Sequence, residues 1–580
     1  MSKNINACFL FVFSIAAWIL AHASLTLINA AIFADTSSSD ALNFELIISG
    51  ILLCLGMFVF TNAKVSAFAL SLGFSRMFLA GFQFLAFPLG TQALKELLFF
   101  IDLPGVDLSL AFPCSAGVGL ASYMGFFVIN AGSKTRYMYP ASSFIEDAKR
   151  CKGKGTFVLG VDRKRFLKDV VAVEDKERAL HCQVVGSSGS GKTQFTLSLA
   201  FQDMLRGWPV FFMENKADSR DFKMFLDLAK MAGREKDVIK IDFSDPLSAR
   251  INPIRLPGNT HDPLAIANQI ILAIGREPKV ASESEFYQSL DLSRVFDMAR
   301  IFTGMDQCLS LRRTYMYFSD RKYREKTFEL CKKIKLVQGA KERLAAEAGD
   351  FTSLLTHLAP WSMGTLGRVL NAKHPDVTIE NIFEKNLLAY VLIPLGSLRI
   401  QTNALGKMLI ELLLSYSQMR QKKGYQTPAS IILEEFSEFV TPSFSALVTT
   451  ARSAGLCLTL SHQDFSQLRK VEGTDKDAFI GDVIGNTAGI KVFFNAVDDI
   501  NAEKMAKMFG TFSEPSRTKR VTAGAMGMQS VGDYSERDVE SFHIHPNEFK
   551  RLVPFKAGVR TVGDNAPRLV TTPSVFQIAL

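Results

Sequence analysis

Residues 186–193 read Gly-Ser-Ser-Gly-Ser-Gly-Lys-Thr, and this segment constrains the fold of the chain more than any other feature. It matches the pattern G-x-x-x-x-G-K-[ST] in full. A short apolar run, 179–185, stands directly before it, and residues 194–205 show helical spacing of apolar side chains after it. The order predicts a buried parallel strand, a glycine-rich loop and a helix.

A loop in this position is suited to binding phosphates. Glycines let the backbone N–H groups curl around phosphate oxygens, and the following helix points its positive end at them. We expect Lys192 to reach the β and γ phosphates of ATP and Thr193 to hold Mg²⁺ through its hydroxyl. An ordinary Gly/Ser turn would leave this lysine and threonine unexplained. The predicted nucleotide-binding residues are Gly186, Ser187, Ser188, Gly189, Ser190, Gly191, Lys192 and Thr193.

A pair of carboxylates provides the second candidate feature. Residues 429–435 read Ala-Ser-Ile-Ile-Leu-Glu-Glu, a strand-like run that ends in Glu434 and Glu435. Motors with a phosphate-binding loop need such a pair, because one carboxylate orients the Mg²⁺ shell while the other polarises the attacking water.

Together with two further segments, these features resemble a known family. Residues 450–456 read Thr-Ala-Arg-Ser-Ala-Gly-Leu and lead to Ser461-His462-Gln463. The combination is similar to type IV secretion coupling proteins, the TraD/TraG-type DNA pumps of conjugation, which are related to FtsK-like translocases. The likeness covers roughly residues 155–565. Supporting matches are the segments 211–218, 387–394 and 486–494.

The resemblance implies an α/β fold: a RecA-like motor domain that is interrupted by an all-α insertion and assembles as a hexameric ring. Three stretches between residues 262 and 355 have the 3.6-residue periodicity that fits such an insertion. They are 265–274, 285–302 and 326–346.

The same resemblance implies roles for individual residues. Glu435 would be the catalytic base, Gln463 would sense the γ-phosphate, and Arg452 would reach into the site of a neighbouring subunit. Thr193 and Glu434 would hold Mg²⁺, although the family usually has Asp at the position of Glu434, which puts the hydrolysis rate in doubt. Arg452 as a surface charge and Gln463 as a loop cap remain alternatives, and His462 is assigned to packing.

The first quarter of the chain predicts membrane insertion. Four uncharged runs are each long enough for a transmembrane helix, and basic residues gather on one side of them. We expect a multi-pass protein of the bacterial inner membrane with both termini and the motor domain in the cytoplasm. The alternative keeps two spans and makes the third and fourth runs a re-entrant or buried pair. The runs are 8–33, 46–63, 77–94 and 109–130.

The expected organisation therefore has five parts. They are a transmembrane region of four helices at 1–131, a juxtamembrane linker at 132–155, the first part of the nucleotide-binding domain at 156–257, the all-α insertion at 258–360, and the second part of the nucleotide-binding domain at 361–580, which contains a mobile loop at 511–540.

The charge balance is compatible with an anionic partner. The formal net charge is +9, and basic clusters such as Arg312-Arg313 fall in the expected insertion, where solvated helix faces would explain them equally well. The eight cysteines form no close pair and no zinc spacing.

We therefore expect a coupling ATPase that moves substrates into a type IV secretion channel. Its expected partners are further copies of the chain, the channel components, the lipid bilayer, and either single- or double-stranded DNA with its relaxase or protein effectors. The alternative is a membrane receptor or adaptor in which ATP binding is a structural switch with little turnover. A weaker third possibility, a chromosome-partition translocase, would carry a DNA-reading domain, which we do not recognise.

Overall fold

The structure is a computed structural model, and the part that it describes begins at residue 139. It covers 139–162, 169–216, 219–259, 261–278, 285–331, 334–346, 351–393, 396, 401–425, 427–441, 443–470, 481, 483, 485, 489–524, 527–564 and 566–575. The predicted transmembrane region 1–131 lies outside these residues. Two compact units divide the chain, Met1–Arg136 and Tyr137–Leu580, and the described residues all belong to the second.

Among the described residues, no helix combines the length and the apolar character that crossing a bilayer requires.

A mixed sheet forms the centre of the second unit, with eleven strands among the described residues. Its strand order is β3-β2-β14-β13-β10-β4-β9-β8-β5-β7-β6. The seven strands from β10 to β6 run parallel to one another, and β13, β14, β2 and β3 extend the sheet with antiparallel pairs.

The parallel strands are short and apolar because helices cover both of their faces. Successive residues of β5 alternate between two apolar clusters: Phe211 and Met213 face one, while Val210 and Phe212 face the other. The parallel strands are β4 (Cys182–Val185), β5 (Val210–Glu214), β6 (Val238–Asp242), β7 (Leu388–Leu392), β8 (Ala429–Glu434), β9 (Leu456–His462) and β10 (Ile490–Phe493). The others are β2 (Thr156–Asp162), β3 (Asp169–Glu174), β13 (Lys556–Thr561) and β14 (Arg568–Thr571).

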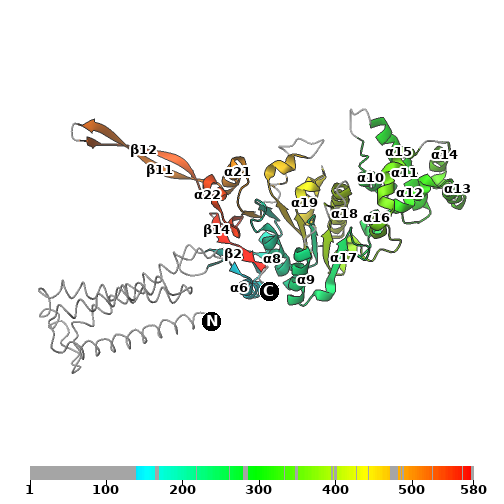
Figure 1. Cartoon of the computed structure of the whole chain (residues 1–580), viewed down its shortest axis with the longest axis horizontal. Helices are drawn as coiled ribbons and strands as arrows, with labels where there is room; N and C mark the ends of the chain where they lie inside the picture. Colours follow the sequence, from blue (N-terminus) through cyan, green and yellow to red (C-terminus); the bar gives the residue numbers. More distant parts are fainter. Residues whose placement is uncertain are drawn as a thin grey trace, which may run out of the picture. The chain divides into compact units, whose positions relative to one another are not determined.

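Helices lie on either side of this sheet (Figure 1). Those packed in and around it are α6 (Ala141–Lys152), α7 (Asp175–Arg178), α8 (Lys192–Leu205), α9 (Ser219–Met231), α17 (Ile379–Glu384), α18 (Gln401–Lys423), α19 (Phe444–Ser453), α21 (Asp499–Phe509) and α22 (Pro546–Arg551).

The second half of the expected linker 132–155 is part of this core. Strand β1 (Tyr139–Pro140) pairs with β15 (Pro573–Ser574), and α6 buries Phe144 against Phe201 of α8, with ring centroids 6.0 Å apart. Tyr139 also donates a hydrogen bond of 2.6 Å to Asp147. The linker prediction is therefore wrong for residues 139–152, because their few apolar side chains become buried.

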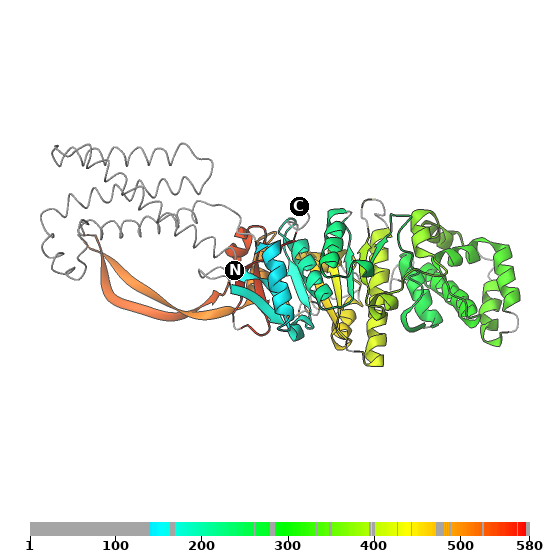
Figure 2. The same cartoon turned by 90° about the horizontal axis from the view of Figure 1, so that it is seen from below.

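Between β6 and β7, the described residues form a group of helices. These are α10 (Pro263–Ala273), α11 (Glu285–Gly304), α12 (Leu311–Ser319), α13 (Arg321–Leu330), α14 (Gln338–Ala346), α15 (Thr352–Ser362) and α16 (Gly364–Leu370). The helical group thus extends to Leu370, beyond the expected boundary at residue 360. Figure 2 shows these helices in green beside α18.

The third expected helix, 326–346, is two helices instead. A 3-10 turn, Lys335–Val337, separates α13 from α14. At this break Val337 packs directly over Gly304 of α11, where a Cβ atom would lie 2.7 Å from the valine Cγ1. The 3-10 turn and α14 both contact α11, and the single expected helix is divided before them.

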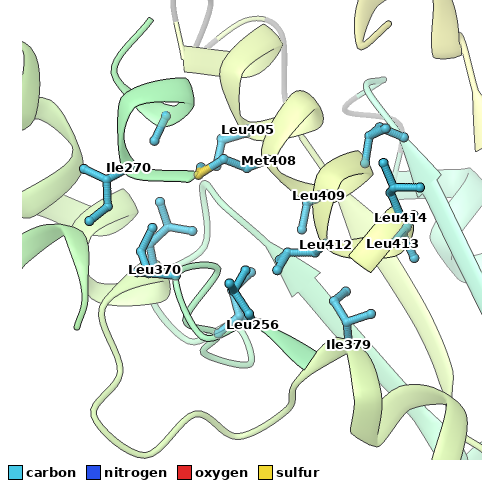
Figure 3. Packing of buried hydrophobic residues seen from close by; sticks show 14 of the residues in the cluster. Leu256, Ile270, Leu370, Ile379, Leu405, Met408, Leu409, Leu412, Leu413 and Leu414 are labelled. Atoms are coloured by element: carbon cyan, nitrogen blue, oxygen red, sulfur yellow. The ribbon is translucent and has the colours of Figure 1, made fainter. Parts of the chain in front are cut away.

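Helix α18 joins the helical group to the sheet. Figure 3 shows Leu405 and Met408 of α18 near Ile270 of α10, and Leu409 and Leu412 on the side of Ile379. All of these residues belong to one buried apolar cluster, so α18 has two apolar faces rather than one.

The expected mobile loop at 511–540 is a β-hairpin in the structure. Strands β11 (Thr511–Gly524) and β12 (Gly527–Phe542) pair in antiparallel register, with Arg517 opposite Glu536 and Phe512 opposite Ser541. Residues 511–524 and 527–542 therefore form strands where we expected a loop, because their sequence lacks the apolar alternation that identifies a half-buried strand.

Candidate nucleotide-binding site

The phosphate-binding loop lies between β4 and α8, as the sequence predicts. Gly189 and Gly191 have φ values of 74° and 109°, a region that residues with a side chain rarely adopt. Gly186 has no room for a side chain either, because a Cβ atom there would lie 2.5 Å from Cβ of Phe494. All three glycines of the loop are therefore required, two by their backbone conformation and Gly186 by its contact with Phe494.

Two neighbouring segments hold the loop in place. The amide of Ser187 donates a hydrogen bond of 2.9 Å to the carbonyl of Asn495, which follows β10. On the other side, the amide of Phe555 donates one of 2.9 Å to the carbonyl of Ser190. The backbone N–H groups in the first turn of α8 lie next to this loop. Like those of any α-helix, they have no acceptor within the helix.

Lys192 is the first residue of α8 and is only 4% exposed. Its Nζ donates hydrogen bonds to the carbonyls of Gly186 at 2.6 Å and Ser187 at 3.0 Å. Burial lowers the pKa of this ammonium group, and the nearby Glu435 and Glu434 partly oppose that effect. The ammonium group of Lys192 thus lies against the phosphate-binding loop, near the carboxylates of Glu434 and Glu435.

Glu434 lies beside the start of α8. Its Oε2 is 3.5 Å from Thr193 Oγ1 and accepts a hydrogen bond of 3.1 Å from Ser461 Oγ, while Oε1 accepts one from Thr196. β4, β9 and β8 are adjacent and parallel. Their carboxyl ends therefore lie at the same end of the sheet, which brings these groups together.

Glu435 follows β8 in a left-handed backbone conformation, with φ 51° and ψ 39°. Such a conformation is uncommon for a residue other than glycine, asparagine or aspartate. The next residue, Phe436, is fully buried and stacks on Phe444 at a centroid distance of 5.2 Å. The sharp turn therefore lets Phe436 enter the core while the Glu435 side chain stays in the site.

Gln463 is in contact with the candidate base. Its Nε2 donates a hydrogen bond of 3.0 Å to Oε1 of Glu435, and its backbone amide lies 3.3 Å from Oε1 of Gln467. The neighbouring His462 is fully buried, and burial lowers its imidazole pKa to about 4. A neutral His462 that contacts Phe436 and Phe465 is suited to packing.

Arg452 is the one predicted site residue that the structure places elsewhere. It lies in the last turn of α19, just before β9 begins at Leu456. The loop lies beyond the opposite end of β9, and the seven residues of that strand extend over about 20 Å. Arg452 is exposed and lies far from the phosphate-binding loop of its own chain.

Two residues near the end of β5 belong to the site although we assigned them no role from the sequence. Lys216 forms an ion pair with Glu435, with 3.3 Å between Nζ and Oε1. Glu214 is 1% exposed and accepts a hydrogen bond from the hydroxyl of Tyr390. Their signal in the sequence was a run of polar residues directly after an apolar strand, which is where parallel sheets place functional groups.

Glu214 is a neutral acid at physiological pH. Burial raises the pKa of its carboxyl group to about 9, and the nearby Asp221 and Glu434 act in the same direction. Its Oε2 is buried and has no hydrogen-bond partner among the described residues.

The site fits a nucleotide with Mg²⁺. The glycine-rich loop excludes side chains where phosphates would approach, Lys192 supplies an ammonium group, and the oxygens of Thr193 and Glu434 are of the hard type that Mg²⁺ prefers. The sequence-predicted residues Lys192, Thr193, Glu434, Glu435 and Gln463 therefore come together in one place.

Comparisons with known proteins agree with this geometry. The family model described as the TraM recognition site of TraD and TraG matches residues 428–554. The matched segment begins at β8 and contains Glu434, Glu435, Arg452, Gln463 and the hairpin.

A curated relative and a solved structure are also similar to the chain. The type 4 coupling protein DotL of Legionella pneumophila is 19% identical over 402 residues, which cover 60% of this chain and 50% of the relative. The chain thus spans about half the length of that relative. The unbound monoclinic form of the bacterial conjugative coupling protein TrwBdeltaN70 aligns with a TM-score of 0.50 and 16% identity, over 74% of this chain and 91% of that one.

The parallel sheet, the loop and the carboxylate pair define the class: a P-loop protein with the α/β fold of RecA-like motors. Within that class, the chain is similar to coupling proteins of type IV secretion systems over the matched segments, and the resemblance seen in the sequence is confirmed.

Proposed function

We propose that this chain is an inner-membrane coupling ATPase, which uses ATP hydrolysis to move DNA or protein substrates into a type IV secretion channel. The observation that carries the proposal is the meeting of Thr193, Glu434 and Glu435 at one end of the sheet. This is the arrangement that hydrolysis of a bound triphosphate requires.

Each residue has a task in this reaction. The amides of residues 186–193 and the Lys192 ammonium bind the phosphates. Thr193 and Glu434 would hold Mg²⁺, which would neutralise charge on the phosphate oxygens. Glu435 accepts a proton from the attacking water. Gln463 holds Glu435 through its hydrogen bond and responds to the γ-phosphate.

Arg452 acts on the site of a neighbouring copy. Arg452 lies near the amino end of β9, whereas the phosphate-binding loop of the same chain lies near its carboxyl end. This position supports the assignment, because an arginine finger supplied in trans does not reach the site of its own chain. The hexameric ring is part of the same proposal.

The membrane location and the cargo complete the proposal. The apolar runs before residue 132 support insertion in the inner membrane, and the relatives are described as coupling proteins. The match to the TraM recognition site supports an accessory protein that docks on residues 428–554.

The test is steady-state ATP turnover by the purified full-length chain, with and without DNA. We expect Mg²⁺-dependent turnover that Lys192→Ala abolishes, whereas Lys230→Ala, at an exposed lysine on α9, leaves it unchanged. Turnover that survives Lys192→Ala would exclude this loop as the site of hydrolysis.

One observation favours the alternative, in which ATP binding is a structural switch with little turnover. Both oxygens of Glu434 accept hydrogen bonds from protein hydroxyls, those of Thr196 and Ser461. These hydrogen bonds compete with the coordination of a metal ion by the same oxygens. Glu434→Asp separates the two functions. If the chain is a switch protein, Glu434→Asp should increase ATP turnover, because aspartate is the residue that the family usually has at this position. If the chain is a coupling ATPase, the wild type with Glu434 already turns over ATP.

A further inference from the structure

A lysine outside the phosphate-binding loop forms an ion pair with the second residue of the acidic pair Glu434-Glu435. Lys216 lies two residues after the end of β5, and its Nζ is 3.3 Å from Oε1 of Glu435. The side chain of Lys216 is 40% exposed, whereas that of Glu435 is 7% exposed. The lysine therefore reaches inward from the rim of the site to a nearly buried carboxylate.

Lys216 and Gln463 contact the same atom of Glu435. Gln463 Nε2 donates to Oε1 at 3.0 Å, and Lys216 Nζ pairs with that same Oε1. These two contacts fix the plane of the carboxylate from two separate segments, one after β5 and one after β9. They leave Oε2 as the oxygen that neither of them engages.

The backbone of Glu435 points to a functional reason for this arrangement. The backbone of Glu435 is left-handed, at φ 51°, which is unfavourable for a residue with a side chain. Strain of this kind persists where the surrounding structure determines a side-chain position tightly. Glu435 is held through its backbone turn, through Phe436 in the core, and through the two contacts at Oε1.

The charges around Lys216 direct it to Glu435 rather than to Glu214. Burial opposes the charge on Lys216, but Glu434 and Glu435 outweigh burial and raise the pKa of the ammonium group. Glu214 is protonated at neutral pH, because its own pKa is raised to about 9.

We propose that Lys216 is a positioning residue for the hydrolysis of ATP: it holds Oε1 of Glu435 so that Oε2 is the oxygen that takes the proton of the attacking water. This inference rests on the proposed function and deepens it. As the water oxygen bonds to the γ-phosphorus, the bond from that phosphorus to the bridging oxygen breaks. ADP and phosphate leave, and the proton passes from Glu435 to solvent.

The test compares Lys216→Met and Lys216→Arg with wild type and with the control Lys230→Met in the full-length chain. For Lys216→Met we expect kcat to fall by about ten- to a hundredfold, the cost of a misplaced catalytic group, with KM changed by less than about twofold. The dissociation constant for ADP, measured by calorimetry, should change by less than about twofold. Lys216→Arg should recover at least a third of the wild-type kcat, because a guanidinium can contact the same oxygen.

A double-mutant comparison tests the route through Glu435. In a Glu435→Gln background, Lys216→Met should cause no further loss of kcat, because the carboxylate that it positions is absent. A full additional loss in that background would overturn the proposal. So would an unchanged kcat in Lys216→Met alone, or a weakening of ADP binding equal to the loss of kcat, which would make Lys216 a phosphate ligand.

The failure of this inference can be told from the failure of the proposed function. If wild type hydrolyses ATP and Lys192→Ala does not, the proposed function stands and the Lys216 variants decide the inference. If wild type binds ADP but shows no turnover above Lys192→Ala, the proposed function fails and the positioning role falls with it.

Discussion

Thr193 Oγ1 and Glu434 Oε2 lie 3.5 Å apart, although 241 positions separate the two residues in the sequence. The contact exists because β9 lies between β4 and β8 in the sheet, with all three strands parallel. The hydroxyl at the start of α8 and the carboxylate at the end of β8 thereby reach the same point. A single Mg²⁺ can be shared between them.

A side chain at Gly186 should disturb the phosphate-binding loop. In Gly186→Ala, the new Cβ would lie 2.5 Å from Cβ of Phe494, so either the loop or the end of β10 must move. We expect a loss of about 1–3 kcal/mol in the free energy of unfolding, as for other overpacked sites, and weaker ATP binding. Thermal unfolding and nucleotide titration measure the two effects.

Gly153→Ala is the matched control. Gly153 has φ −63°, and its Cβ would meet only the carbonyl of Arg150 at 3.5 Å, an ordinary contact. Equal losses in the two variants would show that the Phe494 contact does not limit position 186.

Glu214 should make stability depend on pH. Its pKa is raised from 4.5 to about 9 in the folded protein, chiefly by burial. The folded state therefore retains a proton that the unfolded state loses, and stability declines as the pH rises from about 4.5 to about 9. Glu214→Gln keeps the shape without the titration, so its unfolding free energy should fall less over this range. Denaturant unfolding at several pH values provides the measurement, and parallel profiles for the two proteins would be evidence against a raised pKa.

Arg452 should act in trans. Arg452 and the phosphate-binding loop of the same chain lie at opposite ends of β9, so Arg452 does not contact ATP in its own site. Arg452→Ala should therefore abolish turnover while leaving the affinity for ATP unchanged. Mixing it with Lys192→Ala should restore part of the activity, because an intact Lys192 site can then meet an intact Arg452 from its neighbour. Two variants that remain inactive after mixing and reassembly would indicate that Arg452 does not serve a neighbouring site.

The sequence predicted the site better than its surroundings. The loop 186–193 and the pair Glu434-Glu435 were recognisable because each follows a short apolar strand, and parallel strands place their carboxyl ends together. Lys216 was missed because a single lysine after a strand has no motif, and its partner becomes visible only when β5 lies beside β8. The position of Arg452 likewise depended on the direction of β9.

The larger errors of prediction have two physical causes. The segment that forms the hairpin β11–β12 is poor in large apolar residues, so composition alone suggested a mobile loop. Residues 139–152 carry many charges, yet Tyr139 and Phe144 are fully buried. A few anchoring aromatic side chains decide the packing of such a segment, and average composition does not reveal them.

The most direct measurement for the account as a whole compares Glu435→Gln with wild type in the full-length chain, recording both ATP turnover and ATP affinity. Glu235→Gln, at an exposed residue just before β6 begins, is the control. If the loop and the acidic pair form one catalytic site, Glu435→Gln binds ATP with unchanged affinity and loses turnover by about 10²–10⁴-fold. Turnover at the wild-type rate in Glu435→Gln would contradict the account.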